Sequence, residues 1–438
     1  MKPNFVKNVS TWGNHPVVNK LFKAEEDYHK IREFLRQNNE VIAYGNGRCY
    51  GDAALADAMF STRKLNKFIS FDRLNGIIEC ESGVLISEIL EVIIKQGYFL
   101  IITPGTKFIT LGGAIASNIH GKNHHLEGSF VESVIEFKMM VEDGEIITCS
   151  REENAEKFWA TFGAMGLTGI ILSAKIKLKN IESAYIRQES IKAENLDEIF
   201  QLFEESEDWT YTVAWIDCLQ KGKNIGRSIL MRGEFALRAE LPQKWQENPL
   251  RLKKKLSPTI PFYFPSFVLN SFSVRAFNFL YFNKQRQKVV KNFIDYETFF
   301  YPLDAINDWN KIYGKGGFIQ YQMVIPKEKG KEGMKKILET IGRSGQGSFL
   351  AVLKLFGKGN PEAYNSFPFE GYTLALDFKI NRELRQLVDN LDKIVEEFGG
   401  RIYLTKDSMS KPSLTNYLKN VDSSKFVSLQ SKRIKRGS

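Results

Sequence analysis

Three glycine-rich stretches in the first 180 residues constrain most strongly what this chain can fold into. They are YGNGRCYGD (44–52), PGTKFITLGGAIASNIHGKNHH (104–125) and FWATFGAMGLTGIILSAKIKL (158–178). Glycine lacks a Cβ atom, so the backbone at these places can turn with a positive φ angle or approach another group closely. We therefore expect close backbone approaches in this part of the chain, either to a ligand or to neighbouring segments.

The first stretch follows a predicted strand and contains the spacing G-x-G-x-x-x-G at Gly45, Gly47 and Gly51. A Rossmann dinucleotide loop needs G-x-G-x-x-G at the start of a long helix, and the segment after this loop is too broken for such a helix. A structural turn and a phosphate-binding loop of another fold both remain open.

The second stretch gathers three of the five histidines behind a glycine pair. His120 and His124 are four residues apart, which raises the possibility of zinc, but Gly121 weakens a helix there and no nearby carboxylate or cysteine completes a ligand set. We expect no metal and favour a polar site, in which backbone amides approach a flat or anionic ligand. In the third stretch, Gly163, Gly166 and Gly169 are more glycines than a helix-to-strand junction needs.

Length and composition indicate a folded enzyme-sized chain. With 438 residues, 43% of them hydrophobic, we expect two domains. The four cysteines show no close pairing, and we find neither a leader segment nor an apolar run of membrane-spanning length, so we expect a cytoplasmic protein in a reducing compartment. The formal net charge of +10 favours anionic partners.

Hydrophobic periodicity predicts an α+β chain. Strands are predicted at 40–45, 76–83 and 145–150, and a helix at 85–97. Asp143-Gly144 should join two alternating strands in a tight hairpin. After about residue 182 longer helices and antiparallel strands follow, the strands at 317–326, 348–357 and 371–380. We expect domains at 1–182 and 183–398, with 399–438 packing back on the first.

The three glycine stretches, in this order, resemble the FAD-binding domain of vanillyl-alcohol oxidase type (PCMH-type) flavoproteins. Further segments extend the resemblance over nearly the whole chain to the decaprenylphosphoryl-β-D-ribose 2-oxidase family: WGNHP, FYPLDAINDWNKIYG, GFIQYQMVIP, LKLFG and GGRIYLTKDS. The resemblance implies a two-domain α+β fold whose substrate domain is an antiparallel sheet flanked by helices. It also implies oxidation of the 2-hydroxyl of a polyprenyl-phosphate pentose to a 2-keto sugar, as the first half of a 2-epimerisation for cell-wall or surface polysaccharide synthesis.

The same resemblance implies specific residues for the cofactor. The residues expected to bind FAD are Gly45, Asn46, Gly47, Arg48, Cys49, Tyr50, Asp52, Gly105, Thr110, Leu111, Gly112, Gly113, Ser117, Asn118, His120, Ile170 and Tyr403. Many relatives attach FAD covalently through a histidine in the first loop, but Arg48 stands at that place here, so we expect non-covalent FAD.

His120 and Lys406 match the family's catalytic histidine and lysine, and either can serve as the base that takes the hydroxyl proton. The residues expected to contact substrate are Tyr50, Lys122, Gln320, Gln322, Lys354, Phe356 and Lys406. The family further implies an NAD(P)H-dependent short-chain reductase as functional partner. Cys49, Val213, Thr373 and Ala375 depart from the family pattern, which leaves the sugar and the lipid length open.

A basic and aromatic stretch at 242–287 allows two interpretations. LRLKKKL (250–256) and FNFLYF (277–282) provide cations and aromatics for peripheral contact with the inner face of the plasma membrane, or else a solvated turn and core. Two other functions compete with the leading one: an aldonolactone or free-sugar oxidase of the same fold, and a basic nucleic-acid-binding protein. The chain shows no helix-turn-helix, RNP or zinc-finger pattern, so we expect no nucleic-acid partner.

Overall fold

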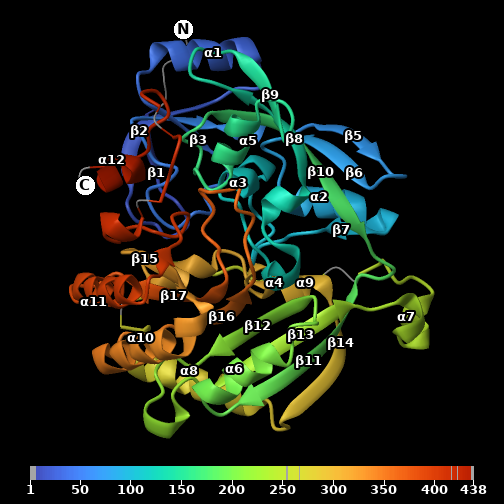
Figure 1. The fold of residues 1–438 in the computed structure, drawn as a ribbon, viewed down its shortest axis with the longest axis vertical. Helices are drawn as coiled ribbons and strands as arrows, with labels where there is room; N and C mark the ends of the chain where they lie inside the picture. Colours follow the sequence, from blue (N-terminus) through green and yellow to red (C-terminus); the bar gives the residue numbers. More distant parts are fainter. Residues whose placement is uncertain (1–5, 253–254, 266, 416, 422, 436–438) are drawn as a thin grey trace.

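The structure is a computed structural model that describes residues 6–252, 255–265, 267–415, 417–421 and 423–435. The strands of these residues form three sheets. Two sheets from the first 180 residues occupy the upper part of Figure 1, and a larger sheet lies below them. The mixture of helices with largely antiparallel sheets confirms the predicted α+β class.

The first sheet has the strand order β1-β2-β4-β3. Its strands are β1 Val6–Val9, β2 Val18–Ala24, β3 Val41–Tyr44 and β4 Ala58–Ser61. Strand β4 pairs in parallel with both β2 and β3. Helix α1, Tyr28–Gln37, covers this sheet because its buried residues Ile31, Phe34 and Leu35 form one apolar face that packs with Phe60.

The second sheet has the order β5-β6-β10-β8-β9, and β7 also pairs with β10. Its strands are β5 Phe68–Asp72, β6 Ile77–Glu81, β7 Tyr98–Leu100, β8 Val134–Met140, β9 Ile146–Ser150 and β10 Ile170–Asn180. The predicted hairpin is confirmed: β8 and β9 pair with Met140 opposite Ile146, and Gly144 has a φ of 86°.

Short helices accompany the second sheet. They are α2 Ile86–Ile93, α3 Leu111–Ala116, α4 His124–Glu127 and α5 Ala155–Thr161. The helix predicted at 85–97 is confirmed, since a 3-10 turn extends α2 to Gln96 and Gly97 ends it with a φ of 78°. That left-handed residue suits glycine and stops the helix.

The third sheet is antiparallel throughout, in the order β14-β11-β13-β12-β16-β17-β15-β18. Its strands are β11 Tyr185–Ala193, β12 Tyr211–Ile216, β13 Ser228–Phe235, β14 Val289–Asp295, β15 Phe318–Pro326, β16 Ala351–Phe356, β17 Gly371–Lys379 and β18 Arg401–Ile402. The three strands predicted after residue 317 are β15, β16 and β17, and they are confirmed.

Helices flank the third sheet. They are α6 Leu196–Glu204, α7 Gln243–Gln246, α8 Ser271–Lys284, α9 Tyr296–Phe300, α10 Gly330–Ser344 and α11 Leu384–Glu397. The buried faces of α6, α10 and α11 share one core with alternate residues of β15, β16 and β17. Because successive strand residues point to opposite faces, the remaining residues of these strands face the N-terminal sheets.

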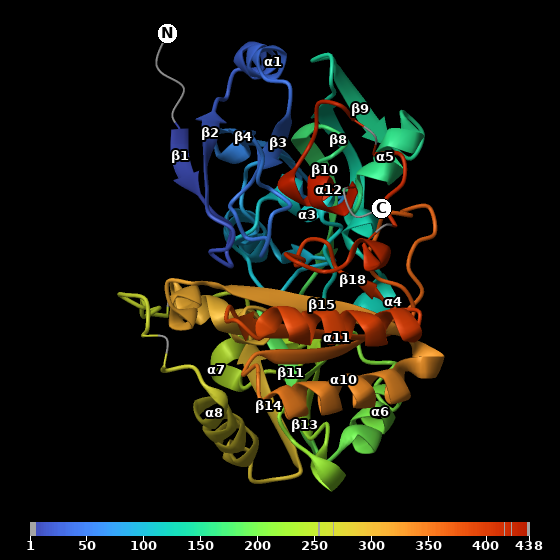
Figure 2. The ribbon, with the colours of Figure 1, turned by 90° about the vertical axis from the view of Figure 1, so that its left-hand side faces the viewer.

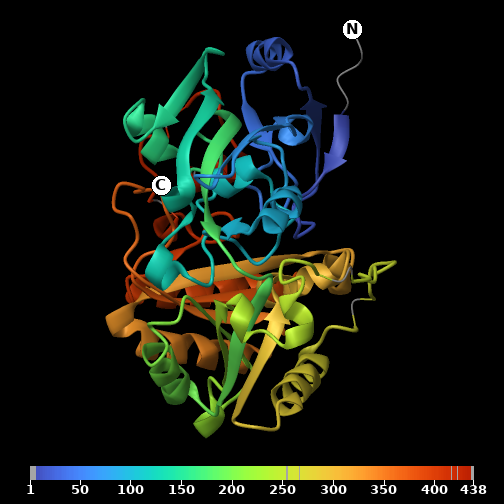
Figure 3. The same ribbon diagram turned by 90° about the vertical axis from the view of Figure 1, so that its right-hand side faces the viewer.

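Helix α8 lies away from the N-terminal sheets and appears in yellow at the lower edge of Figure 3. Val274 and Phe282 are buried, but Phe272 and Leu280 are 79% and 68% exposed. The core interpretation of FNFLYF therefore holds for Phe282 and not for Phe279 or Leu280. Among the residues that the structure describes, no helix has both the length and the apolar character needed to cross a bilayer.

The last segment of the chain returns to the first sheet, as the red ribbon in Figure 2 shows. After β18, Phe426 forms an isolated parallel bridge with Val41. Helix α12, Leu429–Lys435, then begins where Leu429 N donates to Leu55 O at 2.7 Å. Residues separated by almost the full length of the chain are thus direct neighbours.

Candidate active site

A cavity of about 300 Å³ lies between the N-terminal sheets and the third sheet. This volume is at the lower end of the range of ligand pockets. Its wall takes residues from segments 43–54, 104–120, 165–171, 303–309, 320–322, 352–354 and 403–406. All three glycine stretches and the TKDS segment therefore meet at one cavity.

The first glycine loop follows β3 and borders the cavity. Gly47 has a φ of 62°, which residues with a Cβ atom rarely adopt. A Cβ atom at Gly45 would lie 2.5 Å from Thr110 Oγ1, so the loop packs directly on the second glycine stretch. Within the described residues no α-helix lies between β3 and β4, so this loop does not open a Rossmann unit.

Arg48 is fixed by aromatic rings. Its guanidinium carbon lies 3.8 Å from the centroid of the Trp12 ring and 5.3 Å from that of Phe108. Such stacking suits the planar guanidinium group, and it holds the side chain in the cavity wall.

The second glycine stretch enters α3, which Thr110 caps by accepting a hydrogen bond from Gly113 N at 3.1 Å. The amides of Leu111 and Gly112 donate to Val84 O and Ser82 O. Our expectation of free amides here is therefore wrong for residues 111–113, because the protein's own backbone and the cap already occupy them. What Gly112 and Gly113 offer to the cavity is a wall without side chains.

The third glycine stretch contributes Gly166 and Gly169 to the wall. Gly166 has a φ of 86°, and a Cβ atom at Gly169 would lie 2.7 Å from Met139 Cγ. These glycines therefore allow the turn that leads into β10 to pass close to β8. The junction serves both the packing of the sheet and the surface of the cavity.

Most of the predicted cofactor residues lie in the wall of this one cavity. Those that border it are Gly45, Asn46, Gly47, Arg48, Cys49, Tyr50, Gly105, Thr110, Gly112, Gly113, Ser117, His120 and Tyr403. Leu111 and Ile170 are buried in the core, and Asn118 is buried with bonds to Ser366 and Val131. Asp52 is buried beside Arg433. These four residues lie behind the wall rather than in it.

The opposite wall is the face of the third sheet that alternation turns away from helices α6, α10 and α11. Gln322, Ala375 and Val352 lie side by side on β15, β17 and β16 and border the cavity. Gln320 and Lys354 are two residues along the same strands and border it as well. Lys122 and Phe356, also predicted for substrate, do not reach the wall: Lys122 Nζ donates to Phe299 O, and Phe356 packs on the ring of His120.

Lys406 lies in the turn after β18 and points into the cavity. Its Nζ lies 4.0 Å from the centroid of the Tyr50 ring. Burial lowers the pKa of Lys406, while the nearby carboxylate of Asp377 opposes that shift. A lysine in this setting loses its proton more easily than an exposed one, which a base requires.

Two further lysines crowd the same region. Burial, reinforced by the charge of Lys354, lowers the pKa of Lys122 to about 7. Burial, reinforced by Lys406, lowers that of Lys354 to about 7. Lys354 Nζ is 3.5 Å from Gly121 O. An anionic ligand would stabilise the charged form of both lysines.

His120 is buried and neutral. Burial and the charge of Lys354 hold its pKa well below the usual value. Gln322 Nε2 lies 3.1 Å from His120 Nε2, and because an amide nitrogen can only donate, Nε2 is the acceptor. The ring of His124 also packs on that of Phe356, with ring centroids 4.5 Å apart. Within the described part of the chain, no group of three or more His, Cys, Asp or Glu side chains is placed to hold a metal.

Sequence reasoning missed Asp377 on β17. Its carboxylate accepts from Gln320 Nε2 at 2.6 Å and from Tyr313 Oη at 3.3 Å. Burial raises its pKa, which the charge of Lys406 opposes. A lone acid inside the apolar strand GYTLALDFKI was the available signal, because an unpaired carboxylate is rarely buried without a role.

Comparison with known proteins identifies the family. A model described as FAD binding domain matches residues 21–150. Decaprenylphosphoryl-β-D-ribose oxidase of Mycolicibacterium smegmatis is 36% identical over 93% of this chain and 90% of its own length. L-gulonolactone oxidase of Mus musculus is 27% identical over 38% of each chain. Cytokinin dehydrogenase 2 of Arabidopsis thaliana is 31% identical over 32% of this chain and 28% of its own.

The residues of the cavity fit FAD. One wall consists largely of glycines and of Ala43, Ala53, Ala54 and Ala116, whose small size leaves room for a flat ring system. Ile109, Ile119 and Ile171 add apolar surface beside it. The chain is an FAD-dependent oxidoreductase with an α+β fold. It belongs to the decaprenylphosphoryl-β-D-ribose oxidase family of FAD-binding flavoproteins.

Proposed function

We propose that this enzyme oxidises the 2-hydroxyl of a polyprenyl-phosphate pentose, similar to decaprenylphosphoryl ribose, to a 2-keto sugar. The observation that carries the proposal is the concentration of Lys406, Lys354 and His120 around one cavity, opposite the glycine wall that fits FAD. Buried cations without a full set of acidic partners suit an anionic substrate.

We further propose residues 1–182 as the FAD domain, 183–398 as the substrate domain and 399–438 as a segment that completes the first.

In the proposed reaction the C2–H bond breaks, the hydroxyl proton leaves, and a C2=O bond forms. FAD, when bound, accepts the hydride with its two electrons. We assign the base to Lys406 Nζ, because its burial favours the neutral form that can take a proton. His120 Nε2 already accepts a hydrogen bond from Gln322, so we assign it to orienting the sugar rather than to proton removal.

Lys354 is the cation that we assign to the phosphodiester of the substrate. It lies on the sheet wall, and Lys122, whose pKa the charge of Lys354 helps to lower, is a nearby second cation outside the wall. A compact ammonium group binds phosphate oxygens as a point charge and needs no bidentate geometry. Gln320 borders the cavity on the other side of the row formed by Gln322, Ala375 and Val352, and we assign it to binding the sugar hydroxyls.

We propose that the enzyme meets its lipid substrate by peripheral contact with a membrane. Segment 255–265 is bonded to the neighbours of Trp309, a residue of the cavity wall, with Ile260 N donating to Asn307 O and Phe264 N to Lys311 O. Phe262 in this segment and Phe267 just after it are exposed. Lys253 and Lys254 of the predicted basic cluster lie outside the described residues. Exposed aromatic side chains can insert at the lipid interface.

The proposed product is a 2-keto sugar, which a separate NAD(P)H-dependent short-chain reductase would reduce to the epimer. The sequence similarity to decaprenylphosphoryl-β-D-ribose oxidase supports this place in the reaction order, as the first half of a 2-epimerisation for cell-wall or surface polysaccharide.

The variant Lys406→Ala tests the site. Anaerobic mixing of wild-type enzyme with polyprenyl-phosphoryl ribose should bleach the flavin absorbance, and Lys406→Ala should slow this by about 100-fold or more, because base catalysis contributes 10²–10⁴-fold. The exposed Lys393 on α11 provides the control variant Lys393→Ala, which should reduce at the wild-type rate.

Two outcomes would contradict the assignment. Reduction of Lys406→Ala at a near wild-type rate would remove Lys406 from the reaction. Rapid reduction of the wild type by free ribose or an aldonolactone, and none by the lipid-linked sugar, would replace the proposed substrate with that of a free-sugar or lactone oxidase.

A further inference from the structure

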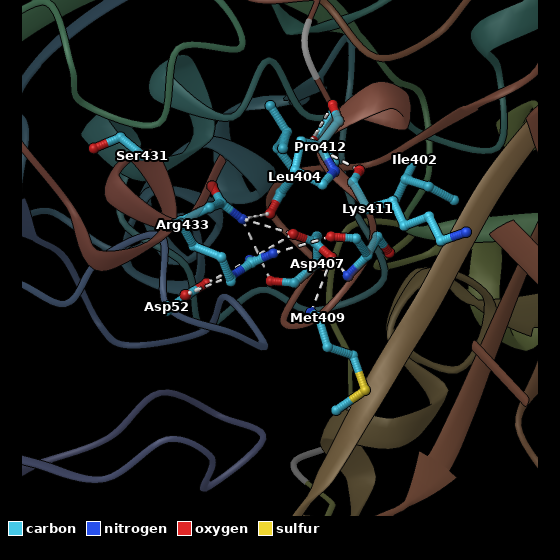
Figure 4. A network of polar contacts seen from close by, with 12 residues as sticks. Asp52, Ile402, Leu404, Asp407, Met409, Lys411, Pro412, Ser431 and Arg433 are labelled. Carbon is cyan, nitrogen blue, oxygen red and sulfur yellow. Dashed lines mark hydrogen bonds and ion pairs between the residues drawn. The ribbon is translucent and has the colours of Figure 1, made fainter. Parts of the chain in front are cut away.

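Figure 4 shows a cluster of charged side chains that joins three distant segments, and none of Asp52, Asp407 and Arg433 borders the cavity. Asp52 ends the first glycine loop, Asp407 follows Lys406, and Arg433 lies on α12. Arg433 Nε and Nη2 donate to the two carboxylate oxygens of Asp52 at 3.0 and 2.9 Å. The same Nη2 donates to Asp407 Oδ2 at 2.6 Å.

The two carboxylates depend on this arginine. Both are buried. Burial raises the pKa of Asp52, Arg433 opposes that shift, and the charge of Asp407 adds to it. Asp52 and Asp407 in turn raise the pKa of Arg433. Without the guanidinium group, two acids would face each other in a buried place, and either protonation or separation of their segments would follow.

Asp407 connects Arg433 to the turn that carries Lys406. Its Oδ1 accepts from the amides of Met409 and Ser410 at 3.1 and 2.8 Å, and its own amide donates to Tyr403 O. Gln430, one helical turn before Arg433, donates to Leu404 O at 2.7 Å. The turn is therefore held both through the side chain of Asp407 and through hydrogen bonds to its backbone.

The first glycine loop lies against the same turn. Tyr50 N donates to Thr405 O at 3.2 Å. A Cβ atom at Gly51 would collide with the backbone carbonyl of Asp407 and lie 2.9 Å from Ser408 Oγ. The distance between the cofactor wall and Lys406 thus depends on how tightly loop and turn remain joined.

We propose that Arg433 is a positioning residue that locks the Lys406 turn to the first glycine loop and so sets where the lysine stands relative to the cofactor. The role rests on the proposed function of Lys406 as the base. Arg433 itself does not border the cavity, so it acts through Asp407 and Asp52. A guanidinium group is needed because one planar fork binds both acids, which an ammonium group does less well.

The first measurement is independent of substrate. In the FAD-loaded enzyme, amide hydrogen exchange of the peptide covering 403–410 should be roughly tenfold faster or more in Arg433→Ala than in the wild type. A peptide from α10 should be unchanged. Lys432→Ala is the matched control on the same helix, since Lys432 pairs at the surface with Glu40 and Asp57 and should alter neither peptide.

The second measurement separates positioning from a structural role. In anaerobic reduction by the lipid-linked sugar, Arg433→Ala should lower the rate at saturating substrate by on the order of 10- to 100-fold per bound flavin, with little change in the half-saturating concentration. The pH at which the rate is half maximal should also shift, because the environment of Lys406 changes. Arg433→Lys should recover part of the rate. Asp52→Asn leaves the bond between Arg433 and Asp407 in place, so it should have a smaller effect than Arg433→Ala.

The inference fails if exchange of 403–410 is unchanged in Arg433→Ala, or if exchange rises equally throughout the chain. It also fails if the rate per bound flavin and its pH profile remain those of the wild type. Should Arg433→Ala not fold, the same criteria apply to Arg433→Lys and Asp52→Asn. If the wild type does not react with the lipid-linked sugar, the proposed function fails while the exchange experiment still decides the role of Arg433.

Discussion

Lys354 illustrates how this enzyme retains a cation where water is excluded. An unfolded lysine has a pKa of about 10.4, whereas burial lowers that of Lys354 to about 7. Between these values the unfolded state binds more protons, so the free energy of unfolding rises with pH in this window. The buried charge of Lys354 therefore lowers the free energy of unfolding at neutral pH. Binding of an anionic ligand would offset this cost.

We predict that Lys354→Met stabilises the substrate-free protein at neutral pH. Replacing a buried ionic group with an apolar one of similar size can raise stability by about 1–4 kcal/mol. Losing a hydrogen bond to a charged partner should at the same time raise KM for the lipid-linked sugar by about 10- to 100-fold. Thermal unfolding and steady-state kinetics measure the two effects. An unchanged KM would show that Lys354 does not hold the phosphodiester.

The pH dependence of catalysis follows from the same lysines. Lys122 and Lys354 must be charged to attract the phosphodiester, and with pKa values near 7 their charged fraction falls as pH rises. KM should therefore increase between about pH 6 and 8, while kcat should increase with pH as Lys406 loses its proton. Kinetics across this range test both trends. The KM trend should flatten in Lys354→Met, and a KM that falls with rising pH would contradict the assignment.

Arg48 allows a prediction about the cofactor. Its guanidinium group lies over Trp12 and offers no nucleophilic nitrogen of the kind that an imidazole provides. We expect FAD to be held without a covalent bond. Acid precipitation should release the yellow colour into the supernatant, and spectra of the pellet and supernatant measure this. Colour that remains with the precipitated protein would contradict the prediction.

Strand alternation explains how one element serves both the core and the site. On β15, Ile319, Tyr321 and Met323 face helices, whereas Gln320 and Gln322 face the cavity. The sheet therefore holds polar side chains rigidly on a scaffold that the helices support from behind. A shift of one residue in the register of this strand would exchange the two sets.

Helix α8 should contribute to membrane contact through its exposed side chains. We predict that Phe272→Ser with Leu280→Ser weakens binding to vesicles that contain anionic lipid, because each change removes exposed apolar surface. Flotation measures the bound fraction, which should also fall with added salt. The control is Leu74→Ser, since Leu74 is 95% exposed in the turn between β5 and β6. Equal binding of the double variant and the wild type would exclude this face.

Local signals predicted much of the architecture. The hairpin at Asp143-Gly144 and the helix that ends at Gly97 were predictable because a turn or cap residue and a short periodic segment determine them. The grouping of Gln320, Gln322 and Lys354 came from family resemblance, since their spacing along the chain carries no sign of a common site. The amides of α3 were misjudged because their acceptors, Ser82 and Val84, lie in another segment.

The long-range bonds escaped prediction for a related reason. Arg433 and Asp52 are 381 positions apart, and a basic residue in a short helix near the end of the sequence looks like ordinary solvated surface. Asp377 carried a local signal, but its partners Gln320 and Tyr313 come from other elements. Hydrogen bonds and ion pairs of this kind become visible only once the sheets are assembled.

The return of α12 to the first glycine loop has a consequence for biosynthesis. Ribosomes deliver residues 44–52 early and residue 433 after all of its partners, so the nascent polypeptide presents an unfinished pocket through most of its translation. FAD that reaches the chain during elongation meets a first glycine loop that Arg433 has not yet bound. The bonds between Arg433 and Asp52 can form only after α12 has been synthesised.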